Sequence, residues 1–390
     1  MQGLKKISLG ISALLVSLSA RADYAWNFPE PVTPMALDTL HVHNKFMLIC
    51  MAIFVAVLAI MIYSIFAHRK SKNFKPVADR APSTATEIFW TLIPFAILLL
   101  IDFVIMGIPA YHSVVMMEDT RDKANMVIKI TGSQWRWQYE YLDGDAQGIK
   151  FVSNLSTPTE QTDKGYTGVK GENYLLEVDN HLVLPVGAKV RILMTSADVM
   201  HNWWVPQFGS SRLAVPGFIR ETWVQVEKAG TYRGQCKELC GKGHGYMPVV
   251  VDALPVEEYK VWVAAKKEEL AKAAAGSDKE WTKEELVATG KTVYEKNCAV
   301  CHQASGAGLP PAFPALTGSK ITTSPIFDAD GKYLKDGHLD RVLNGVRVMP
   351  AWKALLDDTE IAAVITYERN ALGNSVGDVL QPSQVKAARQ

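Results

Sequence analysis

The chain has 390 residues, and its 41 Lys and Arg residues against 40 Asp and Glu residues give a net charge of +1. This length favours two or three domains. The nearly equal numbers of basic and acidic residues do not support nucleic-acid binding, which requires a clustered basic surface. The hydrophobic fraction, 48%, is modestly above that of a soluble protein because two strongly apolar stretches lie near the start.

Residues 1–22 have the features of an export signal. Lys5 and Lys6 precede a short apolar core, and Ala20 and Ala22 stand at the small positions expected before a cleavage site. The core is too short to cross a bilayer, which takes about 20 residues. We therefore expect a signal peptide over residues 1–22, with an uncleaved membrane anchor as the alternative.

Two longer apolar runs, 46–67 and 88–111, predict membrane-spanning helices. The loop between them, 68–87, is rich in Lys and Arg, so the positive-inside tendency places it in the cytoplasm. The segment 23–45 and everything after the second span then lie outside. The second span contains one charge, Asp102, which we expect to face a partner helix because a charge in lipid is costly. The alternative is that Asp102 lies near the end of a shifted span.

Residues 112–255 consist of short alternating segments separated by Pro and Gly. In one of them Val190, Ile192 and Met194 fall on one face while Arg191 falls on the other. Several such segments with turn signals predict an all-β antiparallel sandwich or barrel.

One short segment of this region concentrates metal ligands, namely Cys236, Cys240, His244 and Met247. Thiolates, imidazole and a thioether select copper over hard cations. One cysteine would suffice for a single copper, whereas two can bridge a pair of coppers that share one electron. His201, on an earlier loop, can supply a second imidazole. A structural zinc site is the alternative, which the methionine disfavours.

The end of the chain predicts a different fold. Residues 256–284 are rich in Ala, Lys and Glu and predict a helical linker that breaks at Gly276. Residues 285–373 have helical segments around a Pro- and Gly-rich middle, which predicts a small all-α domain followed by a tail, 374–390.

This domain carries a c-type haem attachment pattern. Cys298 and Cys301 can bind the haem covalently, and His302 follows directly to ligate the iron. Met349 is the only methionine after Met247, and methionine ligation suits rapid electron transfer, so we expect it as the second axial ligand. His338 is the alternative, through bis-histidine ligation.

The segments TGSQWRWQYEY (131–141), SADVMHNWWVP (196–206) and RGQCKELCGKGHGYMP (233–248) resemble cytochrome c oxidase subunit II, over about residues 30 to 260. Residues 285–373 resemble class I cytochrome c. The resemblance implies a cupredoxin sandwich on a two-helix transmembrane hairpin, followed by the all-α cytochrome c domain. It also implies a dinuclear copper centre (CuA). Six residues match its ligands, with the two cysteines bridging: His201, Cys236, the backbone carbonyl of Glu238, Cys240, His244 and Met247.

Further roles are implied only by this resemblance. The Glu238 side chain matches a ligand to a magnesium ion shared with subunit I. Trp135 matches the aromatic residue over the copper where electrons enter, and Glu87 matches a carboxylate at the mouth of a proton-uptake path. Arg136 departs from the family pattern, because an aromatic residue often stands between the two tryptophans.

The expected function is that of subunit II of a haem-copper terminal oxidase, a cytochrome-c oxidase. Electrons would pass through haem c and CuA to subunit I, which reduces oxygen to water and pumps protons. The expected partners are subunits I and III and a donor, either a cytochrome c or a cytochrome c reductase complex. The expected location is a bacterial inner membrane, multi-pass, with both redox domains on the outer face. The alternative is the electron-entry subunit of a CuA-type nitric oxide reductase. The haem motif disfavours a role in copper delivery. The six copper ligands disfavour a quinol oxidase subunit, which would lack them.

Overall fold

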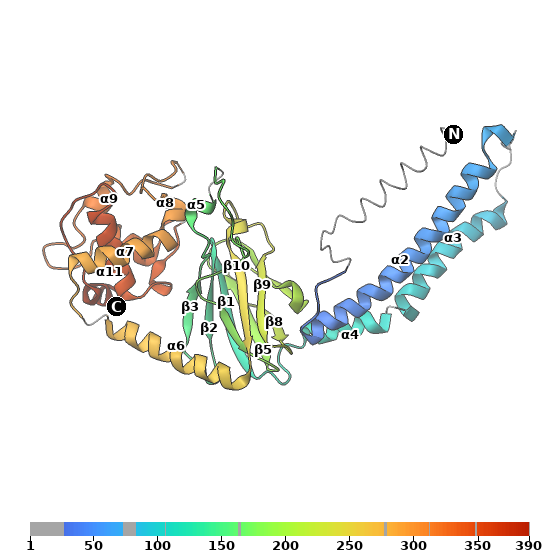
Figure 1. Cartoon of the computed structure of the whole chain (residues 1–390), viewed down its shortest axis with the longest axis horizontal. Coiled ribbons are helices and arrows are strands. Elements are labelled where there is room, and N and C mark those ends of the chain that lie inside the picture. The colour runs from blue at the N-terminus through green and yellow to red at the C-terminus, as the bar shows by residue number, and fades with distance from the viewer. Residues whose placement is uncertain are drawn as a thin grey trace.

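The computed structural model describes residues 27–72, 83–105, 107–162, 165–276, 279–311, 313–347 and 349–389. The signal peptide expected over residues 1–22 lies outside this part of the chain. Figure 1 shows a helical hairpin, a β-sandwich and a helical domain following one another along the molecule, with the hairpin and the helical domain at opposite ends. This architecture confirms the predicted fold class.

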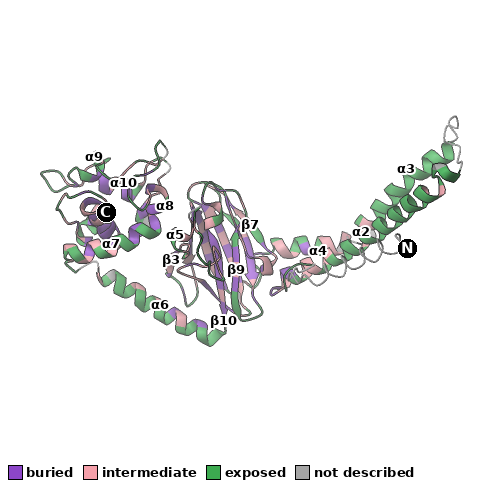
Figure 2. Cartoon of the chain, turned by 45° about the horizontal axis from the view of Figure 1, so that its top comes forward, coloured by how far each residue is buried: buried purple, intermediate pink, exposed green. Residues whose placement is uncertain are grey.

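The hairpin begins with helix α2 (Pro34–Ala67), capped by the Thr33 side chain, which accepts from the backbone N–H of Ala36. After η1 (Lys70–Lys72), helix α3 (Thr84–Leu99) runs back along α2. Among the described residues, two helical stretches are long and apolar enough to cross a membrane, Pro34–Ala67 and Thr84–Phe103. Their side chains are largely exposed within this chain, as Figure 2 shows, so lipid or other subunits must cover them.

Helix α3 continues into a π-helical turn, η2 (Leu100–Ile105), and then into α4 (Gly107–Glu118). Asp102 lies in the π-helical turn and is exposed within this chain. A Cβ at Gly107 would lie 2.2 Å from the Asp102 carbonyl oxygen, so this change of helical geometry requires glycine.

The sandwich consists of two five-stranded sheets, in the orders β3-β2-β1-β5-β8 and β4-β10-β9-β6-β7. The strands are β1 (Met126–Ser133), β2 (Arg136–Tyr141), β3 (Lys150–Ser153), β4 (Leu182–Pro185), β5 (Lys189–Ser196), β6 (His201–Trp204), β7 (Ser211–Ala214), β8 (Arg220–Gln225), β9 (Gly230–Cys236) and β10 (Pro248–Leu254). Two short helices, α5 (Thr159–Thr162) and η3 (Pro206–Phe208), lie in its loops.

Alternation along the strands builds the core as predicted, since Val190, Ile192 and Met194 of β5 are all buried. The expectation of a purely antiparallel arrangement was wrong, because β1 pairs with β5 and β4 pairs with β10 in parallel. Both pairs join strands that are far apart in sequence. A long connection allows the second strand of a pair to run parallel to the first. The alternation of residues within a strand does not show whether that strand pairs in parallel or antiparallel.

Helix α6 (Val256–Gly276) leaves the sandwich at the end of β10 and reaches the C-terminal domain (Figure 1). Tyr259 and Val263 are buried in the sandwich core, and Trp262 and Leu270 pack against it. The Lys266 ammonium group also donates to the Asn180 side chain at 3.4 Å. The segment between the domains is therefore a helix fixed to the sandwich along much of its length.

The C-terminal domain contains α7 (Lys283–Asn297), α8 (Ala299–His302), α9 (Lys320–Thr323), α10 (His338–Asn344), η5 (Trp352–Ala354), α11 (Asp358–Asn370) and α12 (Pro382–Ala388). Helices α7 and α11 begin with capping boxes and cross closely. At the crossing, a Cβ on Gly290 would lie 2.0 Å from the Ala363 carbonyl oxygen. Leu380 and Val385, from the segment expected as a tail, are buried in the core of this domain.

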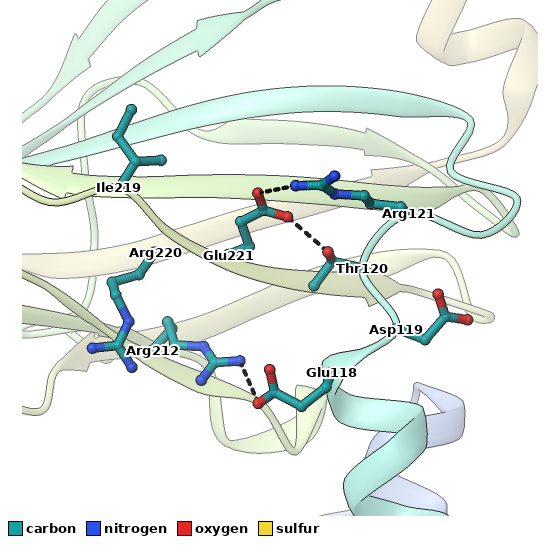
Figure 3. A pocket seen from close by; sticks show the side chains of 8 residues that line it. All are labelled: Glu118, Asp119, Thr120, Arg121, Arg212, Ile219, Arg220 and Glu221. Atoms are coloured by element: carbon teal, nitrogen blue, oxygen red, sulfur yellow. Dashed lines mark hydrogen bonds and ion pairs between the residues drawn. The ribbon is translucent and has the colours of Figure 1, made fainter.

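The junction of α4 with the sandwich is polar, as Figure 3 shows. The Glu221 carboxylate accepts hydrogen bonds from Arg191 at 2.6 and 3.1 Å, from Thr120 at 2.8 Å and from Arg121 at 3.2 Å. Arg191 belongs to the sandwich, whereas Thr120 and Arg121 follow α4, so Glu221 ties the sandwich to the end of α4.

Candidate metal centres

The predicted copper ligands meet at one end of the sandwich. His201 is the first residue of β6 and Cys236 the last of β9, and these neighbouring strands pair through Trp203 and Cys236. The other predicted ligands lie on the loop from β9 to β10, which contains η4 (His244–Tyr246). The sheet therefore brings His201, distant in sequence, next to the ligand loop.

The ligand atoms are close enough to share metal ions. The Cys240 sulfur lies 3.9 Å from the Cys236 sulfur, 3.5 Å from the Met247 sulfur and 3.5 Å from Nδ1 of His244. The ligand atoms of His201, Cys236 and Cys240 lie within 4.8 Å of one another. The Glu238 carbonyl oxygen is 3.3 Å from the Cys236 sulfur. All six predicted ligands thus surround one small volume, while the half-exposed Glu238 side chain belongs to the surface of the loop.

An unpartnered buried atom supports a metal at this point. His201 is fully buried, and its Nε2 atom is bonded to Asp198 at 2.9 Å. Its Nδ1 atom is buried with no hydrogen-bond partner among the described residues. A buried polar atom without a partner needs an explanation, and a metal held together with the two thiolates provides one. The residues therefore fit a copper centre.

The two thiols ionise unequally because they share a hydrogen bond. This bond lowers the pKa of Cys236 to about 4, against the opposing effect of burial. The same bond raises the pKa of Cys240, and burial raises it further. Cys236 is therefore the more acidic of the two thiols, and a metal bound by both sulfurs would displace their protons.

Trp135 lies against the ligand loop. Its indole N–H donates to the Cys240 carbonyl oxygen at 3.2 Å, and the Gln134 side chain donates to the same oxygen at 2.8 Å. A Cβ on Gly243 would lie 2.4 Å from the indole ring, so the loop and the ring are in direct contact. Trp135 is only 9% exposed. The structure therefore places it beside the predicted ligands, beneath other parts of the chain.

The predicted haem-binding residues line a cavity of about 470 Å³ between the C-terminal domain and Gln134 and Arg136 of the sandwich. Cys298, Cys301, His302 and Met349 all contribute to its wall. Nδ1 of His302 is bonded to the Pro314 carbonyl oxygen at 2.9 Å, which leaves Nε2 for an iron ion. Two thiols, an oriented imidazole and a thioether around one cavity fit a covalently attached haem.

His338, the alternative axial ligand, also lines this cavity. Its Nε2 atom is bonded to the Glu368 carboxylate at 2.7 Å, and both side chains are 5% exposed. Ligation through Nε2 would break this buried pair and leave Glu368 without its partner. Nδ1 of His338, by contrast, is buried with no hydrogen-bond partner among the described residues. Met349 makes no comparable interaction and packs partly buried against the domain core. Met349 stays the predicted second axial ligand, with His338 as the alternative, because both side chains line the cavity.

Glu87 lies apart from both centres. It is exposed in the first turn of α3, the end of the membrane hairpin that Figure 1 shows far from the sandwich. It therefore lies at the end of the hairpin that is remote from the predicted metal ligands.

Two residues around these sites were missed by sequence reasoning. Asp198, which holds His201, stands three residues before it, and this short spacing was the available signal. Asn297, which contacts Arg136 of the sandwich, directly precedes the haem motif. Nothing in the sequence connects Asn297 and Arg136, because they are far apart in the chain.

Comparison with protein families gives three matches. The model "Cytochrome C oxidase subunit II, transmembrane domain" matches residues 21–108, and "Cytochrome C oxidase subunit II, periplasmic domain" matches residues 126–254. The model "Cytochrome C oxidase, cbb3-type, subunit III" matches residues 271–367, the region of the haem motif. The expected resemblance is therefore confirmed for the hairpin, the sandwich and the cytochrome domain.

Individual relatives agree with these matches. Cytochrome c oxidase subunit 2 of Oenothera berteroana is 34% identical over 241 residues, which are 61% of this chain and 88% of the relative. The protein from Triticum aestivum is 33% identical over 262 residues, 66% of this chain and 95% of the relative. A crystal structure of the periplasmic domain of subunit II from Bradyrhizobium japonicum is 37% identical. It covers 38% of this chain and 96% of that one, with a TM-score of 0.32.

Proposed function

The chain belongs to the cytochrome c oxidase subunit II family and carries a C-terminal cytochrome c domain, and from this we propose a specific electron path. An electron from an external donor enters at haem c, passes to a CuA centre and continues to subunit I. There oxygen is reduced to water and protons are pumped. The donor is a cytochrome c or a cytochrome c reductase complex, and subunit III is a further partner.

The chain's own residues have defined tasks in this path. Cys298 and Cys301 would bind haem covalently, with His302 and Met349 on its iron, and the haem supplies a one-electron carrier. His201, Cys236, Cys240, His244, Met247 and the Glu238 carbonyl would hold the two coppers, which supply a second carrier with little structural reorganisation. The Glu238 side chain would bind a magnesium ion at the subunit I interface. Asp198 keeps His201 oriented, with Nδ1 toward the coppers.

One observation supports direct transfer between the two centres. Cys301 packs against the hydrophobic cluster of the sandwich that contains Trp135, and Trp135 donates its N–H to the Cys240 carbonyl oxygen. Packed side chains and one hydrogen bond thus connect the haem attachment site to the copper ligand loop. Trp135 is proposed as the residue through which the two centres are coupled. Its ring lies in direct contact with the loop at Gly243.

The topology follows from the two apolar helices and the sandwich. The protein is proposed to span a bacterial inner membrane twice, with both redox domains on the periplasmic face. Glu87 would then lie at the cytoplasmic side, where an exposed carboxylate can collect protons for a path into subunit I. Glu87→Gln should slow oxygen consumption with both metal spectra intact. Unchanged turnover across pH would make Glu87 a plain surface charge.

The electron path is tested by flash injection of an electron into haem c of the assembled oxidase, followed optically at both centres. We expect haem c to be reduced first and the copper centre second. Trp135→Phe should leave both spectra unchanged and slow the second step, because the indole hydrogen bond to Cys240 is lost. If the copper is reduced before haem c, the proposed order is wrong.

A further inference from the structure

Arg136 is the one clear departure from the aromatic pattern around Trp135, and its surroundings are unusual for a strand residue at the edge of a domain. It opens β2 directly after Trp135 and is 3% exposed. Burial of a guanidinium costs several kcal/mol unless the group is paired. Burial also lowers the pKa of Arg136 to about 10, which leaves it charged at neutral pH. This charge therefore needs partners.

The hydrogen-bond partners come from the cytochrome domain. Nη1 of Arg136 donates to the Asn297 side-chain oxygen at 2.7 Å, and Nη2 donates to the Asn297 backbone carbonyl at 3.3 Å. The guanidinium carbon also lies 4.3 Å from the centroid of the Trp352 ring, a cation–π contact. The planar guanidinium group thus binds two oxygens of one residue and stacks on an aromatic ring. Lysine could not make both contacts, because its ammonium group is not planar.

Asn297 is prepared for this contact. Its side-chain nitrogen donates to the Val293 carbonyl at 2.9 Å, which turns the side-chain oxygen toward Arg136. Asn297 is also the last residue of α7, where the helix leaves free carbonyl groups and the negative end of its dipole. A cation is favoured at this position. The next residue is Cys298, so the contact is made beside the haem attachment site.

The contact closes the face above the copper ligands. Gln134 and Arg136 of the sandwich line the haem cavity together with Cys298 and Cys301. Trp135, between them, is almost fully covered. A second, more exposed ion pair joins Lys296 of α7 to Asp179 of the sandwich at 3.5 Å, so the contact extends beyond Arg136.

We propose that Arg136 fastens the cytochrome domain over the copper centre through Asn297 and Trp352, so that the chain's own haem occupies the face where a separate donor would otherwise dock. Arg136 is a positioning residue, and the proposal rests on the electron path proposed above. It explains why a buried cation stands where an aromatic residue is expected. The surface next to Trp135 thus binds a domain of the same chain. The hydrogen-bond partner of Arg136 in that domain, Asn297, is neutral.

The test compares assembled oxidases carrying Arg136→Met, Asn297→Ala, both changes, or Arg220→Met. Arg220 is an exposed arginine at the start of β8 and serves as a matched control for loss of charge. Two readouts are taken: the rate of electron transfer from haem c to copper, and the enhancement of copper spin relaxation by oxidised haem c. The second readout reports the distance between the centres without turnover.

Arg136→Met should reduce the transfer rate about tenfold, since a buried charge-assisted hydrogen bond changes a docking equilibrium by roughly that factor. It should also weaken the relaxation enhancement, with both optical spectra unchanged. Adding Asn297→Ala should cause little further loss, because both changes remove the same contact. Arg220→Met should match the unaltered protein.

Unaltered rate and relaxation in Arg136→Met, or fully additive losses in the double variant, would overturn the role of Arg136. Equal effects of Arg136→Met and Arg220→Met would also overturn it, since the cause would then be general loss of charge. A failure of the electron path itself is distinguishable, because the unaltered oxidase would then show no transfer from haem c to copper.

Discussion

Oδ1 of Asp198 lies 2.9 Å from Nε2 of His201, so a carboxylate holds the predicted copper ligand through that ring nitrogen. Asp198 is itself fixed by the backbone N–H groups of Gln134 at 2.7 Å and of Val199 at 2.6 Å. Burial opposes its charge, but these bonds lower its pKa. Burial likewise opposes protonation of His201, but the interactions with Asp198 and with Cys236 together raise the His201 pKa.

Asp198→Ala should therefore weaken copper binding by about 10- to 100-fold, the usual effect of removing a residue that orients a metal ligand. The measurement is a copper titration against a competing chelator. Asp252→Ala is the control, because Asp252 forms a similar pair with His181, at 2.7 Å. An affinity equal to that of the unaltered protein would show that His201 needs no orientation by Asp198.

The two cysteines should bind two coppers per chain and share one unpaired electron between them. Cys236→Ser or Cys240→Ser should abolish this delocalised signal, since each sulfur is proposed as a bridge and the pair lie 3.9 Å apart. Electron paramagnetic resonance and metal analysis provide the measurement. One copper per chain with a blue mononuclear spectrum in the unaltered protein would contradict the assignment.

Met349→Ala should lower the midpoint potential of haem c and remove the weak sulfur-to-iron band in the far red, because methionine ligation raises the potential. His338→Ala should change neither. It should instead destabilise the cytochrome domain by about 1–3 kcal/mol, since Glu368 would be left buried without its partner. Redox titration and thermal unfolding separate the two outcomes, and an exchange of the spectral effects between the variants would favour bis-histidine ligation.

Glu221 should make stability depend on pH. Its bond to Arg191, with further bonds to Thr120 and Arg121, lowers its pKa from 4.5 to about 2. A lowered carboxyl pKa stabilises the folded state above the unfolded value, and this contribution is lost as pH falls from about 4.5 to about 2. Glu221→Gln should cost on the order of 1–2 kcal/mol at pH 7, discounted for partial exposure, and almost nothing near pH 2.

The control for this prediction is Glu118→Gln, which removes the ion pair between the exposed Glu118 carboxylate and Arg212. It should have little effect at either pH. Unfolding of the whole protein in detergent, followed by tryptophan fluorescence at several pH values, gives both free energies. A cost of Glu221→Gln that stays constant with pH would show that the carboxylate charge does not stabilise the junction.

Features of this molecule that arise within short segments were predictable from the sequence. Examples are the apolar helices, the alternation at Val190, Ile192 and Met194, and the ligand spacing around Cys236. The parallel pairing of β1 with β5 was not predictable, because it depends on contacts between distant segments. The same holds for Arg136, which in sequence resembles an ordinary exposed strand charge until Asn297 and Trp352 are brought to it.

The packing of α6 on the sandwich fixes the orientation of the cytochrome domain relative to the sandwich. Tyr259 and Val263 fix the start of the helix, and each residue of an α-helix turns the chain by about 100° and advances it by about 1.5 Å. A single residue inserted after Leu270 would rotate the rest of α6 and move Asn297 away from Arg136. Seven inserted residues, about two full turns, would restore the direction at a greater distance. The rate of electron transfer from haem c to copper should therefore vary periodically with the length of α6, whereas a flexible linker would give a smooth decline in this rate.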